Sequence, residues 1–184
     1  MRVALYVDDK NYGGVLTYTV NMSSALRSAG AGVVIFTHEP DGPASEAIVS
    51  ELEMCSDVCF KLPLETKVGH DARLLWRAIE ESAAHIFIPN YRMMPYAAAA
   101  CCSRHTRVRS VGICHNDHPS AYDLLQHYER CLSRFVCASD VTTTGLGARI
   151  PWRSSDIATI RSRPCIKITS LKERQGAYFP ALSS

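Results

Sequence analysis

The sequence predicts an α/β fold built on a single doubly wound, mainly parallel sheet. Short runs rich in β-branched and aromatic residues alternate along the chain with longer segments in which apolar residues recur at helical spacing. Such alternation is typical of parallel strands joined by crossover helices. One run, Val33–Thr37, is apolar almost throughout, as in a strand buried on both faces of a sheet. The 184 residues suffice for one domain with its own core and are too few for two ordinary domains.

Six short runs are predicted as strands, because each is rich in apolar residues and is bounded by polar or turn-forming residues. Pro89 ends the fourth run, since proline cannot donate a backbone hydrogen bond within a sheet. In chain order the predicted strands are Arg2–Val7, Val33–Thr37, Val58–Leu62, His85–Ile88, Arg107–Cys114 and Arg134–Ala138.

The segments between these strands predict helices. The first carries Leu16, Val20 and Leu26 at helical spacing and is followed by Gly30, a residue type that commonly ends a helix. Ser139 follows the last predicted strand and can cap a segment that starts at Asp140. In chain order the predicted helices are Val15–Ala29, Ala44–Met54, His70–Ala83, Pro95–Ser103 and Ser120–Leu132.

The ordered domain is expected to span residues 1–160, and residues 161–184 are expected to form an irregular tail because they are polar and weakly patterned. No apolar run approaches the roughly 20 residues that cross a bilayer. The run Arg2–Val7 is followed by Asp8 and Asp9, which is typical of a buried first strand rather than of a signal peptide. We therefore expect a cytoplasmic protein, and peripheral contact with the inner face of the membrane stays open.

Composition argues against several classes of function. The formal net charge of +2 is too weak to indicate binding to nucleic acid or to an anionic membrane. The eight cysteines include no CxxC spacing, so we expect free thiols that act as small apolar side chains rather than a metal site or a disulfide framework.

Candidate binding residues are sought after the strands, because ligands of parallel α/β sheets bind beyond the carboxyl ends of the strands. Gly13 and Gly14 join the first strand to the first helix. Paired glycines permit positive φ and a close approach of backbone to a ligand in front of a helix N-terminus. The spacing is not the GxGxxG of nicotinamide and flavin sites. A tight turn without a ligand is the alternative.

His115 directly follows the fifth predicted strand and is the candidate for a proton acceptor or a hydroxyl-binding group. His118 lies three residues further on, a spacing that superficially suggests zinc. The neighbouring Asn116, Asp117 and Pro119 instead predict a loop, and no third ligand is evident. No metal is therefore expected, and a purely structural role for His115 stays open.

Two further strand ends supply weaker candidates. Asn90, with Tyr91 and Arg92, could meet a polar acceptor or a phosphate, although an exposed, solvated loop explains these residues equally well. Ser139 is not surrounded by the GxSxG elbow of a serine nucleophile, so capping of the next segment is favoured for it.

Taken together, these segments resemble the N-terminal half of a family 4 glycosyltransferase of the GT-B fold. Each motif alone is loose, but their order and spacing are moderately specific, and the resemblance covers about residues 1–160. The motifs that carry it are Tyr12-Gly13-Gly14-Val15, Val33–Thr37, His85–Asn90, Val111–Pro119, Phe135–Ser139 and the linker Ile150–Ile160.

The resemblance implies a Rossmann-like acceptor-side domain that takes part in hexosyl transfer from a nucleotide-sugar to a hydroxyl of a sugar, lipid or small-molecule acceptor. It implies that Gly13 and Gly14 approach the donor diphosphate or the acceptor, and that His115 lies near the transferred sugar. Asn90 and Ser139 would lie near the same site by analogy. The resemblance implies no cofactor and no metal, and nucleic acid is not expected as a partner.

The stretch after Ile160 departs from the family, because it lacks the E-x7-E motif with which the second domain of the family contacts ribose and sugar. We therefore expect a truncated N-terminal half without its donor-binding domain, with little or no turnover alone. One alternative is a non-catalytic binding module that pairs with a separate C-terminal domain. Another is a different doubly wound fold, such as a small regulator or a nucleotide-dependent epimerase-like domain.

Overall fold

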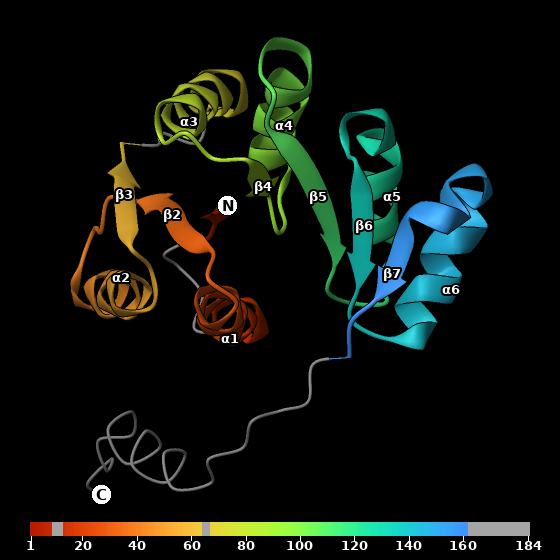
Figure 1. The fold of residues 1–184 in the computed structure, drawn as a ribbon, viewed down its shortest axis with the longest axis horizontal. Coiled ribbons are helices and arrows are strands. Elements are labelled where there is room, and N and C mark those ends of the chain that lie inside the picture. The colour runs from red at the N-terminus through yellow and green to blue at the C-terminus, as the bar shows by residue number, and fades with distance from the viewer. Residues whose placement is uncertain (9–12, 64–66, 162–184) are drawn as a thin grey trace, which may run out of the picture.

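Seven strands form one sheet in the spatial order β3-β2-β1-β4-β5-β6-β7 (Figure 1). The computed structural model describes residues 1–8, 13–63 and 67–161, and the strand pairings within them are parallel. The predicted α/β fold with a parallel, doubly wound sheet is thus confirmed. The strands are β1 (Arg2–Tyr6), β2 (Gly32–His38), β3 (Val58–Leu62), β4 (Ile86–Ile88), β5 (Arg109–Cys114), β6 (Arg134–Cys137) and β7 (Ile157–Thr159).

Helices cover both faces of the sheet (Figure 1). On one face, Leu16 of α1 and Ile48 of α2 pack against β1 and β2; on the other, Leu75 of α3, Tyr96 of α4 and Leu125 of α5 share a second core. The helices are α1 (Gly14–Ser28), α2 (Pro43–Cys55), α3 (Val68–Glu81), α4 (Met93–His105), α5 (Pro119–His127) and α6 (Asp140–Arg149), with short 3₁₀ helices at Glu129–Cys131 and Pro151–Asp156.

The sheet reverses its winding between β1 and β4, which are neighbours in space. From β1 the chain moves outward through β2 and β3, and from β4 it moves outward in the other direction through β5, β6 and β7. The loops at the carboxyl ends of β1 and β4 therefore lead away in opposite directions, and doubly wound sheets usually bind ligands in a crevice at such a point.

Several elements differ from the sequence prediction in their bounds, most of them by one or two residues. β5 begins at Arg109 rather than Arg107, because the Thr106 hydroxyl accepts a hydrogen bond from the backbone N–H of Val108 and holds a turn there. The helix predicted over Ser120–Leu132 ends at His127, and a 3₁₀ turn follows that leads the chain into β6. β7 adds a seventh strand to the six predicted, within the linker that the resemblance includes.

The end of α1 confirms the role predicted for Gly30. This residue has a φ of 78°, in the left-handed region that favours glycine. The backbone N–H of Gly30 donates to the carbonyl of Arg27, and that of Ala31 donates to the carbonyl of Leu26. These two bonds are the Schellman motif that ends many helices. The predicted tail, beyond Arg161, lies outside the described residues.

Gly145 of α6 predicts a measurable packing effect. A Cβ at this position would lie 2.4 Å from the Tyr122 hydroxyl oxygen, and the buried Tyr122 ring has little room to move. We expect Gly145→Ala to lower the free energy of unfolding by about 1–3 kcal/mol, the usual cost of overpacking. Urea unfolding at neutral pH measures the change.

Gly147 on the same helix provides the matched control, because a Cβ there meets nothing within 4 Å among the described residues. Alanine has the higher helix propensity, so Gly147→Ala should be neutral or stabilising by up to about 1 kcal/mol. Equal effects of the two substitutions would contradict the packing explanation.

Candidate functional site

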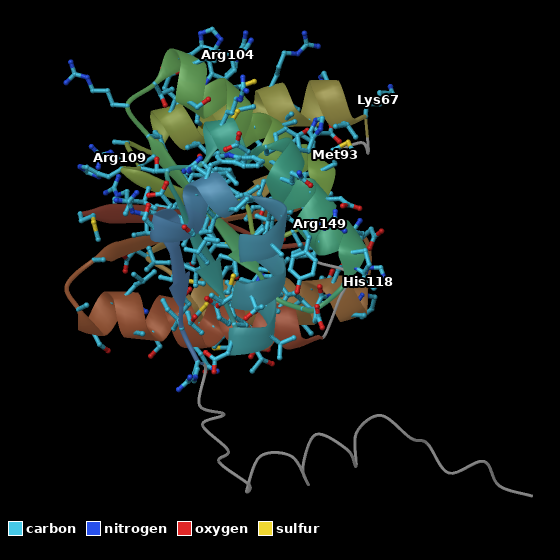
Figure 2. All side chains as sticks on the ribbon, turned by 90° about the vertical axis from the view of Figure 1, so that its right-hand side faces the viewer. Lys67, Met93, Arg104, Arg109, His118 and Arg149 are labelled. Carbon is cyan, nitrogen blue, oxygen red and sulfur yellow. The ribbon has the colours of Figure 1, made fainter. Side chains whose placement is uncertain are left out.

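The carboxyl edge of the sheet, where such a crevice is expected, carries residues that follow four different strands. Asp8 follows β1, Asn90 follows β4, His115 follows β5 and Ser139 follows β6. Figure 2 shows Met93 and His118 on this side of the molecule, and Arg104 and Arg109 on the opposite side. The strand-end loops predicted from the sequence therefore lie along one edge.

His115 is held by a side chain from α1. The ring of Tyr18 meets the imidazole edge-on, with 4.9 Å between ring centroids and 88° between ring planes. This contact places the first turns of α1 beside the end of β5. Tyr18 was not among the predicted site residues. Burial raises the pKa of the Tyr18 hydroxyl, which therefore stays protonated at neutral pH.

The imidazole of His115 is largely buried, and its Nε2 has no hydrogen-bond partner among the described residues. Burial lowers the pKa of His115 to about 4, because the charged ring would lose its hydration. At neutral pH the ring is therefore uncharged. A neutral imidazole can donate a hydrogen bond from one nitrogen and accept one at the other, which suits a hydroxyl group.

The low pKa of His115 predicts a pH-dependent stability. The unfolded chain takes up this proton near pH 6.5, whereas the folded chain resists it down to about 4. The contribution of His115 is therefore fully present above about pH 6.5 and is lost as the pH falls toward 4. We expect the loss to be roughly 2 kcal/mol between about pH 7.5 and 4.5.

The measurement is urea unfolding of the wild type and of His115→Gln across that pH range. Glutamine does not titrate, so the free energy of unfolding of the variant should fall less steeply than that of the wild type. Parallel curves for the two proteins would show that His115 is protonated equally in the folded and unfolded states, against the burial argument.

Asn90 is buried rather than solvated, with 1% of its surface exposed. Its φ of 58° lies in the left-handed region, which asparagine tolerates better than most residues. The side-chain amide donates to the carbonyl oxygen of Tyr6 at 2.7 Å and so ties the β4 loop to the end of β1. Its Oδ1 is buried without a partner among the described residues. The exposed-loop interpretation of Asn90 is therefore wrong.

An ion pair joins the loops that follow β1 and β4, the neighbouring strands from which the chain winds in opposite directions. The Arg92 guanidinium lies 2.6 Å from the carboxylate of Asp8, whose side chain is only 3% exposed. Arg92 has a φ of 69°, a second left-handed residue in the same loop, and its guanidinium also lies over the Tyr91 ring. Burial, followed by the nearby Asp8 charge, raises the pKa of Tyr91 to about 12. The sequence analysis used Asp8 only as a marker of the strand end and missed this pairing.

Ser139 caps α6, as favoured from the sequence. Its hydroxyl accepts from the backbone N–H of Thr142, and the Thr142 hydroxyl accepts from the backbone N–H of Ser139, which completes a capping box. His118 likewise serves a helix end, because its Nδ1 accepts from the backbone N–H of Ser120 at the start of α5. That bond uses one of the two His118 ring nitrogens that the zinc interpretation needed.

Gly13 and Gly14 begin α1 without the positive φ that the sequence analysis allowed for. Gly13 has extended backbone, with φ −128° and ψ −175°, and no side chain caps the helix. A Cβ on either glycine would meet no described atom within 4 Å. Packing against the described residues therefore does not require glycine at either position.

Two other features, a metal site and a membrane-spanning helix, are not found among the described residues. Within residues 1–8, 13–63 and 67–161, no group of three His, Cys, Asp or Glu side chains is arranged to hold a metal ion. No helix in the described part of the chain is long and apolar enough to cross a membrane. The seven cysteines within the described ranges are free thiols.

The fold and the polar crevice define a Rossmann-like domain of the kind that forms half of a GT-B glycosyltransferase. The chain belongs to Glycosyltransferase Family 4, whose family model matches residues 12–161. The resemblance seen in the sequence motifs is thus confirmed, and the alternative of a small regulator is not supported. No curated protein matches the sequence.

Solved structures share the fold at low sequence identity. A glycosyltransferase from Rickettsia africae ESF-5 superposes with a TM-score of 0.66 at 14% identity, covering 96% of this chain and 49% of that one. A lipopolysaccharide outer core galactosyltransferase in its apo form superposes with a TM-score of 0.62 at 12% identity. The match covers 91% of this chain and 47% of that one. The UDP-GlcNAc 2-epimerase from Neisseria meningitidis, bound to UDP-GlcNAc, superposes with a TM-score of 0.67 at 10% identity. The match covers 100% of this chain and 55% of that one. This chain therefore spans about half the length of these proteins.

Proposed function

We propose that the chain forms the acceptor-side half of a glycosyl-transfer site, in which a hexosyl group moves from a nucleotide-sugar to an acceptor hydroxyl. The observation that carries the proposal is that two buried polar atoms at the carboxyl edge of the sheet, His115 Nε2 and Asn90 Oδ1, have no hydrogen-bond partner among the described residues. A buried polar atom without a hydrogen bond costs about 1–3 kcal/mol. A bound sugar, with hydroxyls that both donate and accept, would supply the missing bonds.

Each residue has a distinct part in this proposal. His115 would orient a hydroxyl of the transferred sugar, since its neutral ring can exchange hydrogen bonds without carrying charge. Asn90 would accept from a second hydroxyl through Oδ1. The N-terminus of α1, at Gly13 and Gly14, would face the diphosphate or the acceptor, because unpaired N–H groups at a helix N-terminus favour an anion. Ser139 would act indirectly, by fixing the start of α6.

The departing diphosphate needs positive charge close by. Among the described side chains in the loops after β1 and β4, the cation is Arg92, and its charge is already neutralised by Asp8. We therefore propose that a second, donor-binding domain supplies most of this stabilisation, and that no metal ion takes part. UDP-sugars are the first donors to test, because the Neisseria epimerase that shares the fold is bound to UDP-GlcNAc.

The test is an assay of the purified 184-residue chain with radiolabelled UDP-glucose, UDP-N-acetylglucosamine and GDP-mannose, with and without EDTA. We expect no transfer or hydrolysis above the rate of the buffer. Robust release of nucleoside diphosphate that His115→Ala abolishes would show that the chain catalyses the reaction alone. It would contradict the proposal that a second domain supplies most of the diphosphate stabilisation. Activity that is lost on adding EDTA would contradict the proposal that no metal ion takes part in the transfer.

One observation favours a second candidate, a non-catalytic module that binds a partner domain. Large apolar side chains stand exposed along the carboxyl edge, where helices begin and β7 ends. They are Val68 at the start of α3, Met93 at the start of α4, Val141 in the first turn of α6, and Ile160 after β7. A partner seated on this edge would cover them. Co-purification with a donor-binding domain but no transfer by the pair would favour this candidate.

A further inference from the structure

A cavity of about 640 Å³ opens at the edge of the sheet opposite the crevice. It lies between the amino ends of β1, β4 and β5 and the end of α3, and its lining includes Glu80, His85, Arg107 and Arg109. Figure 2 shows Arg109 on the side of the molecule away from His118. The volume is in the range of sites that bind small molecules. No part of the glycosyl-transfer proposal uses this cavity.

The floor of the cavity is apolar. Ala84, Ile86 and Val108 line it, and Ala84 and Val108 belong to the core beneath α3 and α4. These side chains are fixed by the sheet, because the backbone N–H of Arg109 donates to the carbonyl of His85 at 3.0 Å and joins the starts of β4 and β5. An apolar part of a ligand would therefore meet a preformed surface.

The lining also carries unpaired hydrogen-bond donors. Arg107, in the bend before β5, and Arg109, the first residue of β5, both line the cavity. Neither guanidinium has an ion pair or a side-chain hydrogen bond within the part of the chain that the structure describes. The backbone N–H of Arg2 donates to Nδ1 of His85, so Nε2 is the ring nitrogen left to act as a further donor.

Charge favours an anion at this place. Two arginines line the cavity against one acid, Glu80, and Arg104 adds a further exposed cation at the end of α4 on the same side (Figure 2). Guanidinium groups bind carboxylate and phosphate oxygens through paired hydrogen bonds. The helix ends nearby are carboxyl ends, which disfavour anions, so the arginines must supply the attraction.

We propose that this cavity binds a small organic anion, with its carboxylate or phosphate on Arg107 and Arg109 and an apolar body against Ala84, Ile86 and Val108. The site is separate from the crevice, so the two can be tested independently. The ligand could be a free metabolite or the exposed end of a lipid, since both present the same head and body.

The test is a titration of the isotope-labelled 184-residue chain, followed by NMR, with octanoate and separately with inorganic phosphate. We expect octanoate to move the backbone amide signals of residues 84–86 and 106–109 to saturation. Phosphate alone should bind at least roughly tenfold more weakly, because it makes no apolar contact. Equal binding of the two probes, or octanoate shifts confined to other residues, would overturn the proposal.

Three variants identify the contacts. Arg107→Gln with Arg109→Gln should weaken octanoate binding roughly tenfold or more, because two charge-assisted contacts are lost. Glu80→Gln should strengthen it, because the lining acid is removed. Arg104→Gln, which alters an arginine outside the lining, should leave it within about twofold. Unchanged affinity in the double variant, with circular dichroism showing that it is folded, would overturn the proposal.

A further experiment distinguishes a lipid ligand from a soluble anion. Sedimentation with vesicles of phosphatidylglycerol, compared with vesicles of phosphatidylcholine, measures binding to lipid. Binding to the anionic vesicles that the double arginine variant loses would support the site with a lipid as its ligand. Octanoate binding without vesicle binding would support the site with a soluble anion. Binding of neither probe would contradict the proposal.

Discussion

Replacing Tyr96 by alanine should lower the free energy of unfolding by about 3–5 kcal/mol, the range for removing a buried aromatic side chain. Tyr96 is fully buried in α4. Its hydroxyl donates to the carbonyl of Asn90 at 3.4 Å and accepts from the backbone N–H of Ile113 at 3.3 Å. The side chain thus supports both the Asn90 loop and the strand that leads to His115. Urea unfolding at neutral pH measures the loss.

Tyr96→Phe is the matched control, because it keeps the ring and removes only the two long hydrogen bonds. We expect it to cost about 1 kcal/mol. In this variant the carbonyl of Asn90 loses one partner, so local opening of the loop, measured by hydrogen exchange, should increase more than global unfolding. A loss from Tyr96→Ala no larger than that from Tyr96→Phe would contradict the packing role of the ring.

Replacing His115 by alanine should lower kcat for sugar transfer about 100- to 1000-fold, measured with this half joined to a donor-binding domain. The expected loss is large because, in the proposed site, the imidazole would supply a positioned hydrogen bond to the sugar, and alanine would leave a void that water can enter. His115→Gln retains a donor and an acceptor and should lose less. Both variants need a folding check by circular dichroism.

His118→Ala controls for the general effect of removing a histidine near the same loop. His118 is exposed and caps α5 through Nδ1, so its loss should reduce stability modestly and leave kcat within a few-fold. If His115→Ala transferred sugar as fast as the wild type, His115 would have only the structural role that the sequence analysis left open.

Much of the fold could be predicted because its signals are local. The apolar run Val33–Thr37 becomes the fully covered strand β2, and Gly30 ends α1 through a left-handed turn, as each residue type favours. The boundary at Arg107 was missed because it depends on one hydroxyl, that of Thr106, which accepts from a nearby N–H. The change from α-helix to 3₁₀ helix after His127 likewise leaves no clear mark in the apolar periodicity.

The sequence predicts which candidate residues follow the strands, but not which side chains they contact. That His115 follows a strand can be read from the chain, but burial lowers the pKa of its ring, and the Tyr18 ring that packs against it comes from a helix near the other end of the domain. The same holds for the ion pair of Asp8 with Arg92, which joins the loops after β1 and β4. Neither contact produces a periodicity or a motif, because its partners meet only when the sheet is assembled.

The measurement that tests the central claim most directly is an NMR titration of the His115 ring with UDP-glucose, UDP-N-acetylglucosamine and GDP-mannose, up to roughly 10 mM. The account predicts that at least one of them moves the Nε2 signal of His115 and the side-chain amide of Asn90 together, to saturation, while His118 stays unchanged. If all three nucleotide-sugars leave both signals in place, or move only signals far from this edge of the sheet, the crevice is not a sugar site.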